Sequence, residues 1–298
     1  MEQEIKKSKF EKFHDKYYKL LLIIPIIILI ISFFYIGKIY SQTGDFLYKD
    51  VSLSGGTTIT LNGDIDLTKL ENELSKNFSG ISFTTLTDIS TRKPTAVVIQ
   101  SRSSVEELKP AIEKILGYSL NDENSSIEFS GSSLGEDFYK QLLIALIISF
   151  VLMSAVIFIL FRTFIPSIAV IFSAFSDIVM PLALVDYLGI KISAAGIAAF
   201  LMLVGYSVDT DILLTTRVLK TREGSLNHRI FGSFKTGMFM TITALAAVLP
   251  AFLLMTSLPD SFRQIFIILS FGLLADIMNT WLTNVSIIKW YCKSKNIQ

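Results

Sequence analysis

Four aspartates lie inside long apolar stretches of this sequence of 298 residues. Asp177 and Asp276 each occur in a separate stretch, and Asp209 and Asp211 lie two residues apart in the segment VGYSVDTDILLTTR. On insertion scales, a carboxylate at the centre of a membrane helix costs about 2.5–3.5 kcal/mol. These side chains are therefore expected to face a helix bundle or a wet cavity, where a carboxylate can bind a proton or a cation.

Helix geometry separates the two neighbouring aspartates. Asp209 and Asp211 project about 200° apart around a helix, so both cannot face one partner. Asp209 shares a face with Gly205 and with Arg217, so this face is expected to turn toward the bundle and to line a route open to the cytoplasm. Asp211 would lie on the opposite face, and the spacing leaves its partner open. For Arg217 the alternative is snorkelling from the helix end to the membrane surface.

The last apolar stretch carries a polar stripe that is expected to face the bundle. Its members recur at i, i+3, i+4 and i+7, which keeps them on one helix face: Asp276, Asn279, Thr280 and Thr283. Here, as for Asp177, the alternative to proton binding is a set of structural hydrogen bonds between helices, worth about 0.6–2 kcal/mol each.

Other chemistry has little support in the sequence. The single cysteine, Cys292, excludes an internal disulfide, and the two histidines, His14 and His228, are too far apart to indicate a structural zinc site. There is no glycine-rich phosphate loop, no Gly-x-Gly-Asp element of an intramembrane aspartyl protease, and no histidine for serine chemistry at Ser207. We therefore expect no enzyme activity, no cofactor and no nucleic-acid partner.

The composition is typical of a protein that crosses a membrane several times. Hydrophobic residues make up 51% of the chain and charged residues 18%, with a mean hydropathy of +0.54. Six apolar blocks are long enough to span about 30 Å of hydrocarbon. They lie at residues 20–36, 141–161, 165–188, 192–219, 236–256 and 262–289. The predicted organisation is a tail at 1–19, an uncleaved first span at 20–39, an external domain at 40–139, a five-helix bundle at 140–291 and a tail at 292–298.

The positions of lysine and arginine predict the orientation of the chain. Six lysines fall within residues 1–19, and the connection at 220–235 is also basic. Both chain ends and this connection are therefore expected in the cytoplasm, with a helix at 225–234 lying on the membrane surface. The charge-poor loops DYLGIK and TSLPDS are expected outside, together with residues 40–139. The predicted location is the cell membrane, within the lipid bilayer.

Residues 40–139 show the periodicities of a small α+β domain. Strand-like segments occur at 51–61, 81–89, 95–101 and 125–131, and helical periodicities occur at 66–78 and 103–116. The order strand–helix–strand–strand–helix–strand predicts a ferredoxin-like fold. The expected protein is thus a polytopic α-helical membrane protein with six transmembrane helices and an extracytoplasmic α+β (ferredoxin-like) domain between the first two.

Together these features resemble the SecF family of protein-export membrane proteins, in particular its archaeal form, over nearly the whole chain. One match is the segment SDIV at 176–179, which resembles a motif of the family's third span. A second is the Gly-Gly-Thr element at the start of the family's external domain, matched here by Gly55, Gly56 and Thr57.

The fourth span carries further matches to the family. Gly205 and Tyr206 begin its GYSV segment, and Arg217 matches its arginine. Asp209 falls on the position at which SecD, the partner of SecF, has an aspartate associated with proton flow. The resemblance therefore implies a proton relay with Asp209 as the prime acceptor and Arg217 as its modulator. The rest of the predicted relay comprises Asp177, Asp211 and Asp276.

The resemblance also implies a function and partners. It implies an accessory subunit of the Sec export machinery that uses the proton motive force to promote polypeptide translocation. Its implied partners are SecD, a SecYE-type translocon channel and the translocating polypeptide. Two alternatives remain open: a free-standing, proton-driven exporter of lipid or small molecules related to resistance-nodulation-division proteins, and a structural scaffold in which the buried aspartates only join helices.

Overall fold

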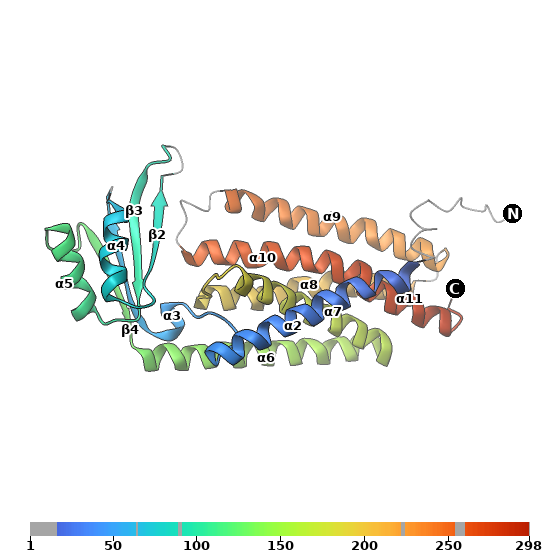
Figure 1. The fold of residues 1–298 in the computed structure, drawn as a ribbon. Coiled ribbons are helices and arrows are strands. Elements are labelled where there is room, and N and C mark those ends of the chain that lie inside the picture. The colour runs from blue at the N-terminus through green and yellow to red at the C-terminus, as the bar shows by residue number, and fades with distance from the viewer. Residues whose placement is uncertain (1–16, 64, 89–90, 222–223, 254–259, 298) are drawn as a thin grey trace.

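The computed structural model describes residues 17–63, 65–88, 91–221, 224–253 and 260–297. They form a long helix bundle with a small α+β domain at one end (Figure 1). Helix α2 (Ile23–Thr43) begins, and helix α11 (Val285–Ser294) ends, at the end of the bundle that lies away from this domain. The lysines of the predicted basic tail other than Lys19, and most of the predicted loop TSLPDS, lie outside the described residues.

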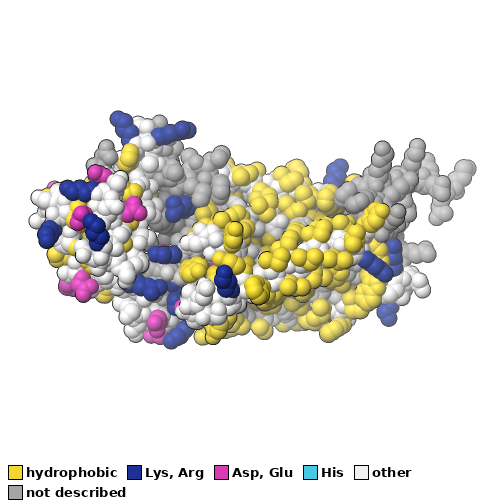
Figure 2. All heavy atoms as spheres, in the orientation of Figure 1, with side chains coloured by type: hydrophobic (Ala, Val, Ile, Leu, Met, Phe, Trp, Pro, Cys, Tyr) yellow, Lys and Arg dark blue, Asp and Glu magenta, His cyan; other side chains and the backbone are white. Residues whose placement is uncertain are grey.

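Six helices are long and apolar enough to cross a membrane, as predicted. In chain order they are α2, α6 (Ser132–Phe161), α7 (Phe164–Tyr187), α8 (Ala194–Lys220), α9 (Leu226–Leu253), and a last helix made of α10 (Asp260–Met278), η2 (Asn279–Asn284) and α11. Hydrophobic side chains form a broad belt along the bundle, and charged side chains gather beyond its two ends (Figure 2).

The bundle has a buried centre made by α7, α8 and the last helix, whereas α2, α6 and α9 expose most of their apolar surface. Small residues allow the helices to approach closely. A β-carbon on Gly272 of α10 would lie 2.3 Å from the Leu203 side chain of α8, and one on Gly237 of α9 would lie 2.5 Å from Trp281. Polar side chains on the inner faces of these helices are therefore shielded from lipid.

The α+β domain lies between α2 and α6 and has the predicted ferredoxin-like order. Strands β1 (Gly56–Asn62), β2 (Ser82–Thr87), β3 (Pro94–Ser101) and β4 (Ser125–Ser130) pair antiparallel in the order β2-β3-β1-β4. Helices α4 (Leu67–Asn77) and α5 (Val105–Leu116) cover one face of the sheet. The core between them includes Ile59, Leu61, Leu70, Leu74, Val97, Ile99, Leu108 and Ile112.

Two local predictions are wrong. Residues 51–54 form a short helix, α3 (Val51–Ser54), instead of strand, because the Asp50 carboxylate caps it by accepting from the Val51 N–H. Residues 226–235 were expected as part of a loop with a separate surface helix, but they are the first turns of α9, which continues without a break. A basic composition indicates which side of a membrane a segment prefers, and it does not show where a helix begins.

The α+β domain is attached to the bundle by a hydrogen-bonded contact as well as by the chain. Just before α3, Lys49 forms a parallel bridge with Ile192, which lies in the loop between α7 and α8. The Asp50 N–H donates to the Ile192 carbonyl at 2.9 Å, and the Ile192 N–H donates to the Tyr48 carbonyl at 2.6 Å. The carboxylate of Asp186, near the end of α7, accepts from the Tyr48 N–H at 3.2 Å. We call this contact of residues 48–50 with Asp186 and Ile192 the strand junction.

Candidate functional site

Three of the four intramembrane aspartates are buried at the centre of the bundle. Asp177 of α7, Asp211 of α8 and Asp276 of α10 are each 0% exposed, and their charges are close enough to interact. The hydrogen bonds that they accept from the described residues all come from hydroxyl or amide groups, and none comes from lysine or arginine. We call these three residues the carboxylate cluster.

Asp177 joins α7 to two neighbouring helices. The Ser207 hydroxyl of α8 donates to one carboxylate oxygen at 2.5 Å, and the Asn279 side-chain amide donates to the other at 2.6 Å. A hydroxyl bond this short is typical of a carboxylate acceptor. The third-span aspartate therefore fixes α7, α8 and the last helix at a single point.

Asp276 is surrounded by threonines. Thr210 of α8 and Thr280, one turn further along the last helix, each approach its oxygens to 3.1 Å, and Thr241 of α9 lies at 3.3 Å. Each hydroxyl can donate a hydrogen bond to a carboxylate or accept one from a protonated carboxylic acid. The threonines therefore suit both protonation states of Asp276.

Asp211 meets the last helix at its π-helical stretch, η2. The side-chain amide of Asn284 donates to the Asp211 carboxylate at 2.6 Å. A π-helical turn holds more residues than an α-helical one, and such turns occur frequently at functional sites.

The predicted polar stripe does face the bundle, and its members are all 0% exposed: Asp276, Asn279, Thr280 and Thr283.

The surroundings of the carboxylate cluster have hydrogen-bonding capacity left over. The side-chain oxygens of Asn279, Thr283, Asn284 and Thr215 are buried and have no hydrogen-bond partner among the described residues. Such atoms are rare in folded proteins. Together with the three carboxylates, these oxygens give the site the groups that can bind a proton or a cation.

The structure reverses the predicted orientation of the two neighbouring aspartates of α8. Asp211 faces the bundle, whereas Asp209 is exposed on the outer face of the helix. The two do lie on opposite faces, as their spacing predicted. The expectation that Asp209 lines the bundle is wrong for this chain, because a helical wheel gives the angle between two residues and not which face the neighbouring helices cover.

Arg217, the predicted modulator of Asp209, donates its hydrogen bonds to α9. Arg217 is half-buried and donates from Nη1 to the Gly232 carbonyl at 2.8 Å and to the Thr236 hydroxyl at 3.0 Å, both on α9. Gly205 is exposed on the same outer face as Asp209. Tyr206, the next residue, donates its hydroxyl to the Met240 carbonyl of α9 at 3.1 Å.

The Gly-Gly-Thr motif shapes the base of the external domain. A β-carbon on Gly55 would lie 2.3 Å from the Cα of Ser132, and one on Gly56 would lie 2.2 Å from the carbonyl oxygen of Ser101. The Thr57 hydroxyl donates to the Ser103 carbonyl at 2.7 Å. The start of α6 packs closely against Gly55, and the backbone at Ser101 and Arg102 packs closely against Gly56. A side chain at either glycine would prevent this approach.

The sequence argument missed the hydroxyl and amide partners of the carboxylates. In α8 a signal was present, because Ser207, Thr210, Asp211 and Thr215 recur at helical spacing and mark the buried face. For Thr241 of α9 there was no such signal. For Asn284 a signal was present, because it lies at i+4 from Thr280 and i+8 from Asp276, which places it on the same helix face as the polar stripe.

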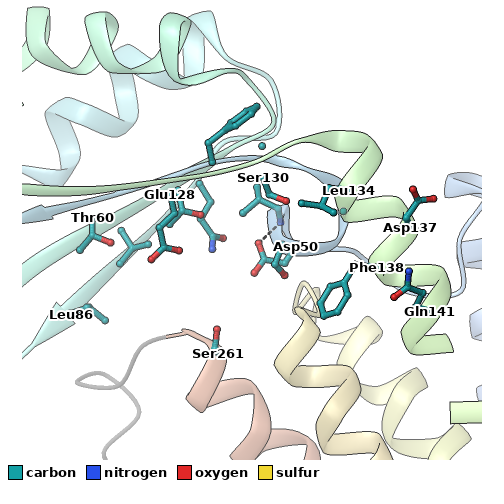
Figure 3. A pocket seen from close by; sticks show the side chains of 18 residues that line it. Asp50, Thr60, Leu86, Glu128, Ser130, Leu134, Asp137, Phe138, Gln141 and Ser261 are labelled. Atoms are coloured by element: carbon teal, nitrogen blue, oxygen red, sulfur yellow. Dashed lines mark hydrogen bonds between the residues drawn. The ribbon is translucent and has the colours of Figure 1, made fainter. Parts of the chain in front are cut away.

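A recess of about 760 Å³ lies between the uncovered face of the sheet and the bundle (Figure 3). The sheet contributes Thr60 and Glu128, α6 contributes Phe138 and Gln141, and Ser261 lies on the opposite side at the start of α10. Its described lining includes no lysine or arginine. The recess therefore offers acidic and apolar groups just outside the membrane-spanning part.

Comparison with known proteins shows a consistent set of relatives. Residues 118–294 match a family model described as protein export membrane protein SecD/SecF, C-terminal. The chain is 36% identical over 283 residues to the protein-export membrane protein SecF of Methanocaldococcus jannaschii, covering 93% of this chain and 96% of that one. It is 34% identical over 295 residues to SecF of Methanolacinia petrolearia, covering 92% and 94% of the two chains.

A solved structure shares the fold. The crystal structure of SecDF, a translocon-associated membrane protein from Thermus thermophilus, matches with a TM-score of 0.73 at 16% identity. The match covers 98% of this chain and 40% of that chain, so this chain spans about two fifths of the solved protein.

The fold and the family model define a multi-pass membrane protein of the SecD/SecF class. Within that class, relatives matched over most of their length are SecF proteins, and the chain belongs to the SecF family of protein-export membrane proteins. It is a transport protein of the membrane and not an enzyme.

Proposed function

We propose that this chain pairs with SecD beside a SecYE-type channel in the cell membrane, and that the pair uses the proton motive force to draw an emerging polypeptide outward. Membership of the SecF family and the fold shared with the translocon-associated SecDF support this proposal. In the proposed topology both chain ends lie in the cytoplasm and the α+β domain lies outside, which agrees with the basic residues at 1–19 and 220–235.

The carboxylate cluster is the observation that carries the proposal. Among the described residues, the three buried carboxylates accept hydrogen bonds only from hydroxyl and amide groups. Three negative charges inside a membrane bundle without a cation beside them are too costly, so the cluster must hold protons or bind a cation. Asp177 and Asp276 together contact α7, α8, α9 and the last helix. A proton that arrives or leaves therefore changes the hydrogen bonds between the helices of the buried centre.

The membrane potential can supply the energy for such a change. Each elementary charge that crosses 100 mV releases about 2.3 kcal/mol. A shift between α7 and α8 would reach the α+β domain through the strand junction, because Ile192 lies in the loop between these helices. The recess beneath the sheet would then change shape, and we assign the contact with the translocating polypeptide to this recess.

We assign the outer face of α8 to SecD. Met202, Gly205 and Asp209 are exposed along this face at i, i+3 and i+7. A carboxylate that faces lipid costs about 2.5–3.5 kcal/mol. A β-carbon on Gly205 would meet nothing within 4 Å, which leaves room for a second helix to approach. In the pair, Asp209 would be covered by SecD and would belong to a site that both subunits complete.

Conservative substitutions in the carboxylate cluster test the proposal. Asp177→Asn, Asp211→Asn and Asp276→Asn keep the side-chain size but remove the exchangeable proton. In membranes that contain SecD and the channel, we expect each variant to lower proton-stimulated export by about tenfold or more, since proton-transfer groups contribute roughly 10²–10⁴-fold. The matched control is Asp122→Asn, an exposed aspartate of the α+β domain, which should export like the unmodified chain.

Membrane abundance and proton uptake are measured in the same samples. Export at the unmodified level in all three cluster variants, at equal abundance, would overturn the proton role. Export that follows a sodium gradient and ignores a proton gradient would assign the carboxylate cluster to sodium instead.

A further inference from the structure

A second recess, of about 700 Å³, lies at the base of the α+β domain and has the opposite charge to that in Figure 3. It is lined by three cationic side chains, Lys49, Arg102 and Lys191, and by one carboxylate, Glu107. Serine hydroxyls are also part of the lining, contributed by Ser54, Ser79, Ser103 and Ser104. We propose that this recess binds the phosphate group of a membrane-lipid headgroup.

The cations of this recess outnumber its carboxylates, and two of the cations form no ion pair with the described residues. The Arg102 side chain forms no hydrogen bond or ion pair with the described residues, and the Lys191 ammonium donates only to the Gly80 carbonyl, at 3.5 Å. Lys49 pairs with the Asp45 carboxylate at 2.7 Å. Glu107 supplies a second carboxylate, so three cations face two carboxylates and a net charge of +1 remains for a ligand. An arginine fork, a lysine and hydroxyl donors are the groups that phosphate oxygens prefer.

The three cations come from distant parts of the chain, and the fold holds their segments together. The strand junction pairs Lys49 with Ile192, the residue next to Lys191. The loop that carries Arg102 is held by Gly56, whose backbone lies against Ser101, and by the hydrogen bond from Thr57 to the Ser103 carbonyl. The Gly-Gly-Thr motif thus holds the backbone at Arg102 beside the recess.

The recess lies at the level where lipid headgroups are expected. Lys191 follows α7 by four residues, and the last residue of α7, Tyr187, contacts Tyr35 of α2 edge to face at 5.7 Å between ring centroids. Aromatic residues are enriched at the boundary between hydrocarbon and water. Lys and Arg side chains gather where the α+β domain meets the hydrophobic belt (Figure 2). A headgroup phosphate at this boundary would meet the recess while its chains stay in the bilayer.

Native mass spectrometry of the delipidated full chain in detergent tests the site. The probe is phosphatidylglycerol, and diacylglycerol, which has no phosphate, is the lipid control. Arg102→Gln combined with Lys191→Gln removes the two free cations. Lys69→Gln combined with Lys114→Gln is the matched control, since both lysines are exposed on the same domain. We expect the first pair to weaken binding of one phosphatidylglycerol about tenfold or more and the control pair to leave it unchanged.

The outcomes separate the possible ligands, and the readout does not depend on export. Equal phosphatidylglycerol binding by the unmodified chain and the Arg102→Gln, Lys191→Gln variant would overturn the proposal, as would equal binding of diacylglycerol. Binding of inorganic phosphate at these residues without retention of lipid would overturn the lipid source and assign the recess to a soluble anion. Loss of SecD from the purified variant with unchanged lipid binding would assign the recess to a protein contact and overturn the site. An unchanged unfolding temperature of the variant shows that it folds.

Discussion

The threonines around Asp276 show, at the scale of single residues, how a carboxylate can be buried without an opposite charge. Thr210 comes from α8, Thr241 comes from α9, and Thr280 lies one turn after Asp276 in the last helix. A lysine or arginine in their place would hold the group permanently ionised, because an ion pair favours the charged form. Hydroxyl groups favour the charged form less strongly, because they carry no net charge and can also accept a hydrogen bond from the protonated acid. Neutral donors therefore keep Asp276 free to change its protonation state.

The two aspartates of α8 should differ sharply when they are removed. Asp211→Ala leaves the buried amide of Asn284 without its acceptor, so we expect the free energy of unfolding to fall by about 1–3 kcal/mol. Asp209→Ala removes a carboxylate that is exposed on an apolar helix of the isolated chain, so it should not destabilise the chain and should stabilise it by up to about 2.5–3.5 kcal/mol. Thermal unfolding of the purified chain in detergent measures both. A larger loss for Asp209→Ala than for Asp211→Ala would contradict the orientation of α8.

At the scale of elements, the glycines of the Gly-Gly-Thr motif at the start of β1 allow neighbouring backbone segments to approach closely. Gly56 has φ of +140°, and a β-carbon there would collide with the Ser101 carbonyl. Gly56→Ala should therefore destabilise the α+β domain by about 1–3 kcal/mol or more. The readout is the rate of protease cleavage within residues 56–130 of the full chain. Gly131→Ala is the control, because its β-carbon would meet nothing within 4 Å and its φ is −63°. Equal cleavage rates for the two variants would contradict the tight contact.

The sequence predicts elements well where one periodicity dominates. Leu70 and Leu74 recur at helical spacing and do lie buried in α4, and the apolar blocks do form six membrane helices. The prediction from sequence fails where tertiary contacts decide whether a segment forms a helix or a strand. Residues 51–54 alternate like a strand but form α3 once Asp50 caps them. No local sequence pattern predicts η2, because a π-helical stretch depends on the residues that pack against the last helix.

The candidate site was predictable in part for the same reason. Burial cost alone predicted that Asp177 and Asp276 face the bundle, and they do. The choice between Asp209 and Asp211 depended on which face of α8 meets other helices. That information is present only in the contacts of the whole chain, and in the proposed pair the surroundings of Asp209 also include SecD.

At the scale of the whole molecule, no helix among the described residues covers the exposed face of α8. A bulky side chain at Gly205 should therefore leave the isolated chain stable but prevent close approach of SecD. For Gly205→Leu we expect co-purification of SecD in mild detergent to fall about tenfold or more. Gly37→Leu on α2 is the control, since its β-carbon also meets nothing within 4 Å.

Partners are identified by mass in both preparations. Normal recovery of SecD with Gly205→Leu would remove the outer face of α8 from the interface. Recovery of a homo-oligomer of the unmodified chain with no SecD would favour the free-standing exporter.

The strand junction gives the external domain a third attachment, besides its covalent connections to α2 and α6. A pull on the sheet is therefore shared with α7 and α8, the helices that carry Asp177 and Asp211. Mechanical coupling of this kind works in both directions, because linked equilibria are reciprocal. A polypeptide that stalls and drags on the domain would resist the helix movement that admits the next proton. Proton entry would therefore become slower when the polypeptide resists movement, and a blocked polypeptide would not dissipate the proton gradient.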